Sequence, residues 1–186
     1  MMITPIDKNY KGLISITGPT RSGKSLLAEF LIKEQESVTY IATSKPRPHD
    51  PAWLKRIDIH RNRRPDSWSL IEHPTDLCNT IESITGNESI LLDSLGGLVE
   101  DHLIENDIQW EIFQNKLLNC LIENNLCIIV VSEEVGWGIV PATPIGHLFR
   151  ERLSKLTSLI GRHSKKKWLA INGTAIDLDK IGYLIP

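Results

Sequence analysis

The residues best suited to chemistry in this chain form a phosphate-binding pattern close to its first strand. Residues 18–25 match G-x-x-x-x-G-K-[ST] at every fixed position. In such a loop the backbone N–H groups surround phosphate oxygens, the lysine reaches the β- and γ-phosphates, and the final hydroxyl ligates Mg²⁺. We therefore predict that a nucleoside triphosphate is bound by Gly18, Pro19, Thr20, Arg21, Ser22, Gly23, Lys24 and Ser25.

The segments on both sides of this loop favour the same interpretation. Residues 13–17 are apolar or β-branched and predict a strand, and residues 26–33 have the pattern of an amphipathic helix. The amino terminus of a helix adds a field that favours a bound anion. The alternative is an ordinary strand-to-helix turn rich in small residues, and the loop together with its context makes that alternative the weaker one.

A carboxylate that could share Mg²⁺ with Ser25 stands at the end of another apolar segment. Asp93 ends the strand predicted for residues 89–93, where phosphate-loop enzymes place the acid that holds the metal. Glu133 and Glu134 are its rivals, because they follow the strand predicted for residues 126–131. An aspartate at a strand end can also be only a turn former or a helix cap. We favour a magnesium site made by Ser25 and Asp93.

Four arginines surround one histidine between residues 56 and 64. By itself, such a segment is usually a solvated helical face. Beside a nucleotide site, however, arginines bind phosphates in a bidentate manner, and a histidine with a pKa near neutrality can act as nucleophile or as acid and base. The residue types alone leave both interpretations of His60 open.

Strand and helix patterns alternate along the chain. We predict strands at 13–17, 38–43, 67–72, 89–93 and 126–131, helices at 26–33, 53–64, 77–84, 110–124 and 148–160, and a terminal hairpin from 167–172 and 174–178. This order predicts an α/β fold, a single domain of the phosphate-loop NTPase type over residues 1–186. Its mostly parallel sheet would be flanked by helices and would end in a C-terminal antiparallel hairpin. We expect flexible or peripheral ends at 1–12 and 179–186.

Composition limits the environment and partners of the protein. The formal net charge is -2 and 41% of residues are hydrophobic, so no overall basic field favours nucleic acid or a membrane surface. No apolar run is long enough to span a bilayer, and residues 1–12 lack the apolar segment of a signal peptide. The three cysteines are scattered, which favours free thiols in a reducing cytoplasm.

Taken together, the motifs resemble those of one family, the bifunctional adenosylcobinamide kinase / adenosylcobinamide-phosphate guanylyltransferase of cobalamin biosynthesis. The resemblance extends from Ile14 to about Leu178. It rests on three blocks in a fixed order, which are Arg21-Ser22-Gly23-Lys24-Ser25, Arg56-Ile57-x-x-His60, and Glu134-Val135-Gly136-x-Gly138-Ile139-Val140-Pro141.

The resemblance implies two reactions at one site. ATP or GTP would phosphorylate the aminopropanol hydroxyl of adenosylcobinamide. His60 would then attack the α-phosphate of GTP and carry GMP to the corrinoid phosphate, giving adenosylcobinamide-GDP, with Lys24 and Mg²⁺ offsetting phosphate charge in both steps. With Lys24 and His60 as catalytic residues, the further nucleotide contacts expected are Ala42, Thr43, Ser44, Arg61, Asn62, Arg63, Arg64, Glu72 and Asp93.

The resemblance also implies an oligomer. Members of the family that it resembles look like trimers, with the active site between subunits. The loop from Gly136 to Val140, which contains Trp137 and Ile139, would suit a contact with another subunit or with a large ligand.

The sequence departs from the family pattern at four places. Residues 50–53 lack the usual Glu-Met, residues 154–158 replace a usual Gly-Arg-x-Asn-Gln, Gly96 stands where threonine is usual, and Glu133 stands where asparagine is usual. Two alternatives to the bifunctional enzyme therefore stay open. The chain could be a kinase that has lost guanylyl transfer, or a nucleotide-binding protein without turnover.

Overall fold

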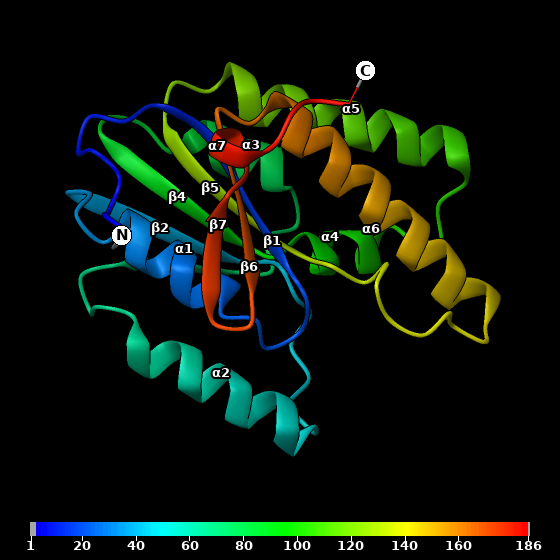
Figure 1. Ribbon diagram of the computed structural model, residues 1–186. Coiled ribbons are helices and arrows are strands. Elements are labelled where there is room, and N and C mark those ends of the chain that lie inside the picture. Colours follow the sequence, from blue (N-terminus) through cyan, green and yellow to red (C-terminus); the bar gives the residue numbers. More distant parts are fainter. Residues whose placement is uncertain (1–2, 186) are drawn as a thin grey trace.

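The computed structural model describes residues 3–185, and within them the chain forms one seven-stranded sheet in the order β3-β2-β4-β5-β1-β6-β7 (Figure 1). Neighbouring strands are parallel except for the antiparallel β6–β7 pair. The strands are β1 (Gly12–Gly18), β2 (Ser37–Ala42), β3 (Ser69–Glu72), β4 (Glu88–Asp93), β5 (Cys127–Glu133), β6 (Lys166–Ile171) and β7 (Thr174–Asp177). The predicted parallel sheet with a terminal hairpin is confirmed. Met1, Met2 and Pro186, which belong to the ends expected to be peripheral, lie outside the described residues.

Helices cover both faces of this sheet. One face packs against α1 (Lys24–Ile32), and the other packs against a layer of four helices. That layer consists of α3 (Leu77–Ser83), α4 (Leu95–Asp101), α5 (Asp107–Glu123) and α6 (Pro144–His163), and a last short helix is α7 (Leu178–Ile181). Within residues 3–185, each helix is too short or too polar to cross a membrane.

The central strands are buried on both faces, which fixes their register. Along β5, Ile128 and Val130 join the core beneath the helix layer, while Ile129 and Val131 join the core beneath α1. Burying side chains of this size is worth about 1.5–3 kcal/mol each, so a slip by one residue would be costly. The register sets Gly18 opposite Glu133, and it sets Asp93 opposite Val131, so the predicted site residues meet at one edge of the sheet.

One helix stands apart from both layers. Helix α2 (Pro51–Arg63) has no buried residue and lies beyond the carboxyl edge of the sheet (Figure 1). The Asp50 carboxylate caps it by accepting from the backbone N–H groups of Ala52 (2.9 Å) and Trp53 (3.1 Å). The helix begins two residues earlier than predicted and ends at Arg63, one residue before the predicted end at Arg64, because the residue before a proline disfavours helical geometry.

The sequence pattern did not predict α4. Gly96 and Gly97 lower its intrinsic helix propensity, but tertiary packing requires glycine here. A Cβ on Gly97 would lie 2.5 Å from Thr43 Oγ1 and 2.7 Å from the backbone nitrogen of Ser44.

Helix α6 also begins earlier than predicted, at Pro144, where Thr143 Oγ1 accepts from Gly146 N at 3.2 Å.

A buried arginine ties α6 to the turn between α4 and α5. Arg152 is 3% exposed, and its guanidinium donates to the carbonyl oxygens of His102 (2.7 Å) and Glu105 (2.8 Å) above the ring of Trp110. We expect Arg152→Ala to lower the free energy of unfolding by about 3 kcal/mol, because it removes a buried guanidinium together with its hydrogen bonds to two partly buried carbonyls. Urea unfolding measures the loss. Arg162→Ala, on the exposed face of the same helix, should change it by less than about 0.5 kcal/mol, and equal losses would contradict this role.

Candidate active site

The phosphate loop is shaped by three backbone positions between β1 and α1. A Cβ on Gly18 would collide with the Ala170 carbonyl oxygen and would lie 2.6 Å from Ser22 Oγ. Arg21 (φ 59°) and Gly23 (φ 94°) both adopt left-handed conformations. Gly23 is also the amino-terminal cap of α1, which has no side-chain cap, so the first N–H groups of the helix remain available to an anion.

Lys24 places a buried positive charge in this loop. The residue is 6% exposed, and its Nζ donates to the carbonyl oxygen of Pro19 at 3.3 Å. Burial lowers the pKa of the Lys24 ammonium below its usual range, and the carboxylates of Glu133 and Asp93 oppose that shift. The ammonium is therefore compensated from two neighbouring strand ends while it remains within reach of an anion in the loop.

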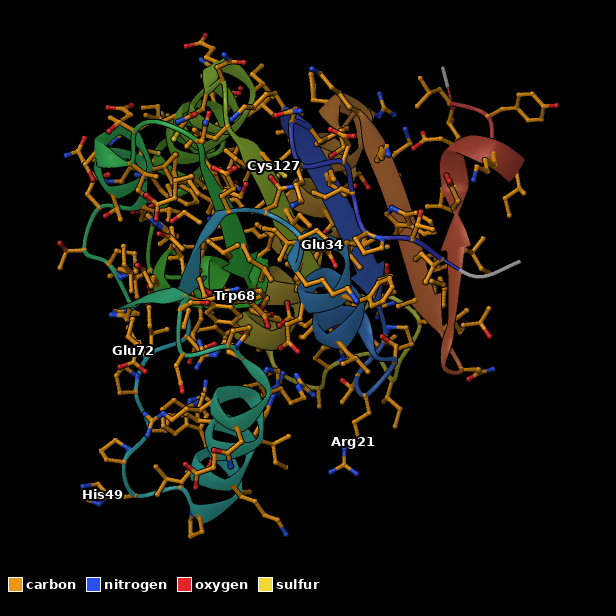
Figure 2. All side chains as sticks on the ribbon, turned by 90° about the vertical axis from the view of Figure 1, so that its left-hand side faces the viewer. Arg21, Glu34, His49, Trp68, Glu72 and Cys127 are labelled. Carbon is orange, nitrogen blue, oxygen red and sulfur yellow. The ribbon has the colours of Figure 1, made fainter. Side chains whose placement is uncertain are left out.

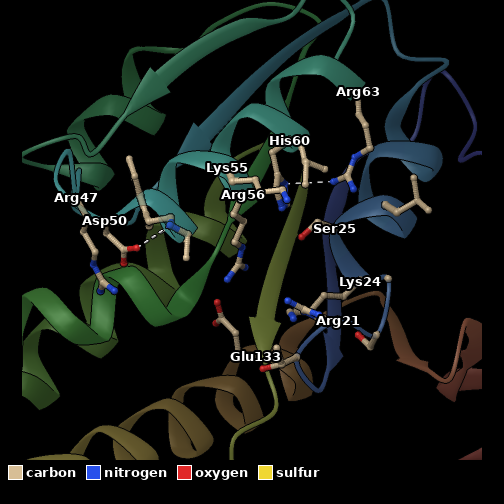
Figure 3. Close-up of a pocket in the computed structure, with 17 residues that line it drawn as sticks. Arg21, Lys24, Ser25, Arg47, Asp50, Lys55, Arg56, His60, Arg63 and Glu133 are labelled. Atoms are coloured by element: carbon tan, nitrogen blue, oxygen red, sulfur yellow. Dashed lines mark hydrogen bonds between the residues drawn. The ribbon is translucent and has the colours of Figure 1, made fainter.

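A cavity of about 850 Å³ separates the phosphate loop from α2 (Figure 3). Its charged side chains are Arg21, Lys24, Arg47, Lys55, Arg56 and Arg63, against Asp50 and Glu133. Within residues 3–185 neither Arg21 nor Arg56 makes an ion pair, and Figure 2 shows Arg21 extending beyond the edge of the sheet at the end where α2 lies. A chain of formal net charge -2 thus concentrates positive charge where a triphosphate would be bound.

A smaller cavity of about 280 Å³ adjoins the first and shares six lining residues with it. The shared residues are Thr20, Arg47, Trp53, Arg56, His60 and Glu133. The smaller cavity lies over the ends of β2, β3 and β4, where Ala42, Glu72 and Asp93 contribute to its wall. The two cavities form one continuous site with His60 at their junction.

His60 faces this junction from α2. Its Nδ1 lies 3.3 Å from Arg63 Nη2 (Figure 3). The same nitrogen lies 3.9 Å from Glu29 Oε1 and 4.0 Å from Asp93 Oδ2. Burial lowers the pKa of the His60 imidazole below its ordinary value, Asp93 opposes this shift, and Arg63 adds to it. The ring is therefore mostly neutral near pH 7, the form in which imidazole is a nucleophile.

Asp93 is fixed from the neighbouring strand. The Tyr40 hydroxyl donates to Asp93 Oδ2 at 2.7 Å, and the guanidinium carbon of Arg64 lies 4.2 Å from the centre of the Tyr40 ring. Burial raises the pKa of Tyr40 well above its usual range, and Asp93 adds to the effect, so the hydroxyl keeps its proton and remains a donor.

The oxygen atoms of Ser25 and Asp93 fit the requirements of a nucleotide-bound Mg²⁺. Among residues 3–185, no three His, Cys, Asp or Glu side chains gather to hold a metal by themselves. Mg²⁺ at a phosphate site takes one or two protein oxygen ligands and completes its shell with phosphate oxygens and waters. A hydroxyl and one carboxylate suit that chemistry.

Glu133 caps α4 from the end of β5. Its carboxylate accepts from the Ser94 hydroxyl and, at 3.1 Å, from the backbone nitrogen of Gly96. A Cβ on Gly96 would lie 2.8 Å from Glu133 Oε2. Two of the positions at which the sequence departs from the pattern of the family it resembles are therefore in direct contact, and glycine leaves the space that the longer glutamate occupies.

The structure brings most of the predicted site residues together. Thr20, Arg21, Ser22, Gly23, Lys24, Ser25, His60 and Arg63 line the larger cavity, and Ala42, Ser44, Arg64, Glu72 and Asp93 line the smaller one. Gly18, Pro19 and Thr43 support the loop and strand ends without lining either cavity. Arg61 and Asn62 are exposed on α2 and line neither cavity, so their nucleotide contacts remain predictions.

Several lining or supporting residues were missed by the site prediction. Arg47 and Trp53 come from the loop and helix after β2, whose position at the carboxyl edge was the only available signal. Arg56 belongs to the basic segment but was not assigned to the site. Glu29 follows Ser25 by four residues, a spacing that places both side chains on one face of α1.

The strand–loop–helix geometry, the buried loop lysine and the basic cavity define a phosphate-loop nucleotide-binding protein. The profile of the family described as cobinamide kinase / cobinamide phosphate guanyltransferase matches residues 14–178, and the chain belongs to this family. It is 29% identical over 181 residues to the bifunctional adenosylcobalamin biosynthesis protein CobU of Escherichia coli, covering 89% of this chain and 99% of that one. It is 33% identical over 166 residues to CobP of Pseudomonas aeruginosa, with 88% and 95% covered. The predicted resemblance is confirmed.

Solved structures agree with the fold. A protein from Pyrococcus horikoshii OT3 superposes with a TM-score of 0.58 at 8% identity, covering 96% of this chain and 94% of that one. An ATPase of a bacterial type III secretion system superposes with a TM-score of 0.50 at 8% identity, covering 93% of this chain and 59% of that one. The predicted phosphate-loop NTPase fold is confirmed.

The contact between Gly96 and Glu133 predicts a coupled effect on stability. Gly96→Thr should cost about 1–3 kcal/mol of unfolding free energy by overpacking, and Glu133→Asn should cost about 1 kcal/mol by removing the cap. The double variant should be less destabilised than the sum by at least about 0.5 kcal/mol. Urea unfolding of all four proteins measures the coupling.

A matched control comes from Gly161, a helical glycine whose added Cβ would have no neighbouring atom within 4 Å. Gly161→Thr should not destabilise the protein and should add independently to Glu133→Asn. Strict additivity of the Gly96 and Glu133 substitutions would contradict the proposed pairing.

Proposed function

We propose that this protein phosphorylates adenosylcobinamide and then transfers GMP from GTP to adenosylcobinamide phosphate through a GMP–His60 intermediate, giving adenosylcobinamide-GDP. The observation that carries the proposal is that His60 of α2 lines one cavity together with Lys24 and Ser25 of α1. A single phosphate site can therefore present a nucleotide both to an acceptor hydroxyl and to a histidine. Membership of the cobinamide kinase / guanyltransferase family supports the same pair of reactions.

In the kinase half, the loop amides and the buried ammonium of Lys24 would bind the β- and γ-phosphates of ATP or GTP. Ser25 and Asp93 would hold Mg²⁺, which when bound offsets negative charge on the phosphates. The unpaired guanidinium groups of Arg21 and Arg56 face the same cavity and would bind phosphate oxygens. Adenosylcobinamide would supply the attacking hydroxyl.

In the guanylyltransferase half, neutral His60 would be the nucleophile. Arg63, Glu29 and Asp93 each have a charged atom within 4.0 Å of Nδ1, which leaves Nε2 as the nitrogen that would attack phosphorus. A covalent carrier divides one difficult transfer into two easier ones. The smaller cavity, with Arg64, Glu72 and Asp93 in its wall, would receive the remainder of the substrates.

We also propose that the protein works as a homo-oligomer, a trimer being favoured by the resemblance to its family. The loop after β5 exposes Trp137 (60%), Ile139 (95%) and Val140 (56%). A cluster of apolar side chains this exposed, next to the cavity wall at Val135, suits a contact with another subunit or with the corrinoid.

The covalent step gives a direct test. Incubation with Mg²⁺ and GTP should add the mass of one GMP to the wild-type protein, and His60→Ala should show no adduct while still binding GTP. The adduct should be labile in acid and stable in alkali, as expected of a phosphoramidate. Intact-mass spectrometry measures both proteins. His147→Ala, which removes an exposed histidine outside both cavities, is the control.

Two outcomes would overturn this mechanism. An adduct of equal yield on His60→Ala would move the nucleophile elsewhere. No adduct on wild-type protein, with GTP binding still measurable, would leave a kinase or a nucleotide-binding protein without guanylyl transfer.

The metal site predicts a second effect. Wild-type protein should bind GTP at least about tenfold more tightly with Mg²⁺ than with EDTA, a difference of about 1.4 kcal/mol. Asp93→Asn should remove most of that difference, because an amide is a weaker ligand for a hard cation. Calorimetric titration measures all four affinities. Asp58→Asn, on α2 but outside both cavities, should retain the wild-type difference, and an Asp93 variant that does the same would exclude this ligand.

A further inference from the structure

A second carboxylate lies beneath the histidine and has no part in the mechanism so far. Glu29 is on α1, one helical turn after Ser25, and is 8% exposed. Its Oε1 accepts from Arg63 Nη2 at 2.9 Å and lies 3.9 Å from His60 Nδ1. Burial raises the pKa of Glu29, and the guanidinium of Arg63 opposes that shift. A buried acid held by an arginine beside a histidine therefore needs an explanation.

Arg63 occupies the position between this acid and the ring. Its Nη2 lies 2.9 Å from Glu29 Oε1 and 3.3 Å from His60 Nδ1. A guanidinium has no acceptor, so in this arrangement Nδ1 is the acceptor and the ring proton is on Nε2. The nitrogen that must attack phosphorus is then protonated and cannot be a nucleophile. The proposed reaction requires the other tautomer.

Arg63 is also placed to bind a phosphate group of a substrate. Arg63 lines the larger cavity, its side chain is 33% exposed, and guanidinium groups bind phosphate oxygens in a bidentate manner. If Arg63 turns to a substrate phosphate, Glu29 loses its hydrogen-bond donor and needs another. The Nδ1–H group of His60 is the nearest replacement. Asp93 Oδ2 accepts from Tyr40 at 2.7 Å, and Asp93 is the proposed ligand of Mg²⁺, so Glu29 is the carboxylate left to accept from Nδ1–H.

We propose that Glu29 is a positioning residue for His60. Substrate phosphate draws Arg63 away, the Glu29 carboxylate accepts a hydrogen bond from Nδ1–H, and Nε2 is thereby left with its lone pair toward the α-phosphorus. This inference rests on the proposed GMP–His60 intermediate. It couples the arrival of a phosphate to the tautomer that reacts.

The chemistry balances with this assignment. The Nε2 lone pair forms a bond to the α-phosphorus of GTP, the bond from that phosphorus to the oxygen bridging to the β-phosphate breaks, and pyrophosphate leaves with the electron pair. The Nδ1 proton stays on the ring, so the phosphoramidate carries a positive charge on the imidazole. Glu29 and Asp93, both within 4.0 Å of Nδ1, offset that charge.

Rates of adduct formation test the proposal. With wild-type protein, Mg²⁺ and GTP, intact-mass spectrometry at short times gives the rate of GMP transfer to His60. Glu29→Gln should lower that rate at least about tenfold, because it favours the wrong tautomer, while GTP affinity changes by less than about threefold. Glu29→Asp, which keeps an acceptor carboxylate, should regain part of the rate. Glu34→Gln removes an exposed carboxylate just after α1 and should leave rate and affinity unchanged.

The tautomer itself is visible by ¹⁵N nuclear magnetic resonance. With a GTP analogue that has carbon between the α- and β-phosphorus atoms, wild-type His60 should be protonated at Nδ1, and Glu29→Gln should shift the proton to Nε2. This measurement on wild-type protein decides the matter even if Glu29→Gln fails to fold.

The outcomes separate this inference from the function on which it rests. A wild-type adduct with an unchanged rate in Glu29→Gln, or a wild-type ring protonated at Nε2 beside the analogue, overturns the role of Glu29 alone. Absence of a wild-type adduct overturns the guanylyltransferase mechanism and this inference with it.

Discussion

Lys24 carries an ammonium group into a place where only 6% of the residue is exposed, and such a charge is costly unless negative groups compensate it. The strand order β4-β5-β1 supplies the compensation, since Asp93 ends β4, Glu133 ends β5 and the loop of Lys24 follows β1. Each carboxylate is itself held, Asp93 by the Tyr40 hydroxyl and Glu133 by the amino end of α4. In this site the buried ammonium thus lies near two carboxylates, and each carboxylate accepts a hydrogen bond of its own. The register of the parallel sheet sets the positions of these groups.

Charge also replaces apolar packing in holding α2. The helix has no buried residue. Near the site, the Arg63–Glu29 ion pair joins it to α1, and Arg64, which directly follows it, contacts the Tyr40 ring. Substrate phosphates compete for the same guanidinium groups. A helix fastened in this way can change its contacts when an anion enters, whereas a helix anchored by a hydrophobic face could not do so without exposing that face. His60 therefore lies on a helix whose anchoring guanidinium group, that of Arg63, also lines the larger cavity.

The sequence predicted the parts of the molecule that depend on local signals. Periodicity located the strands, and the loop pattern from Gly18 to Ser25 located the phosphate site because its glycines are required by backbone geometry. It missed α4, whose two glycines disfavour a helix locally and are required by contacts with Thr43 and Glu133. Arg47 was missed for a related reason, since its pairing with Glu100 depends on that helix. Contacts between segments that are distant in the sequence leave no periodic pattern. The part of the site that depends on such contacts could therefore not be predicted from local sequence.

The pair of Gly96 and Glu133 illustrates why departures from a family pattern must be judged in space. Taken singly, a glutamate near bound phosphate adds repulsion, and a glycine in a helix lowers its stability. In the structure, the glutamate carboxylate accepts hydrogen bonds at the amino end of α4 and faces the cavity beside Lys24, where it offsets a buried positive charge. The glycine leaves room for this arrangement, since a Cβ at position 96 would lie 2.8 Å from the carboxylate. The two departures are therefore one change in physical terms, since the space left by Gly96 holds the carboxylate of Glu133, and both residues line the smaller cavity.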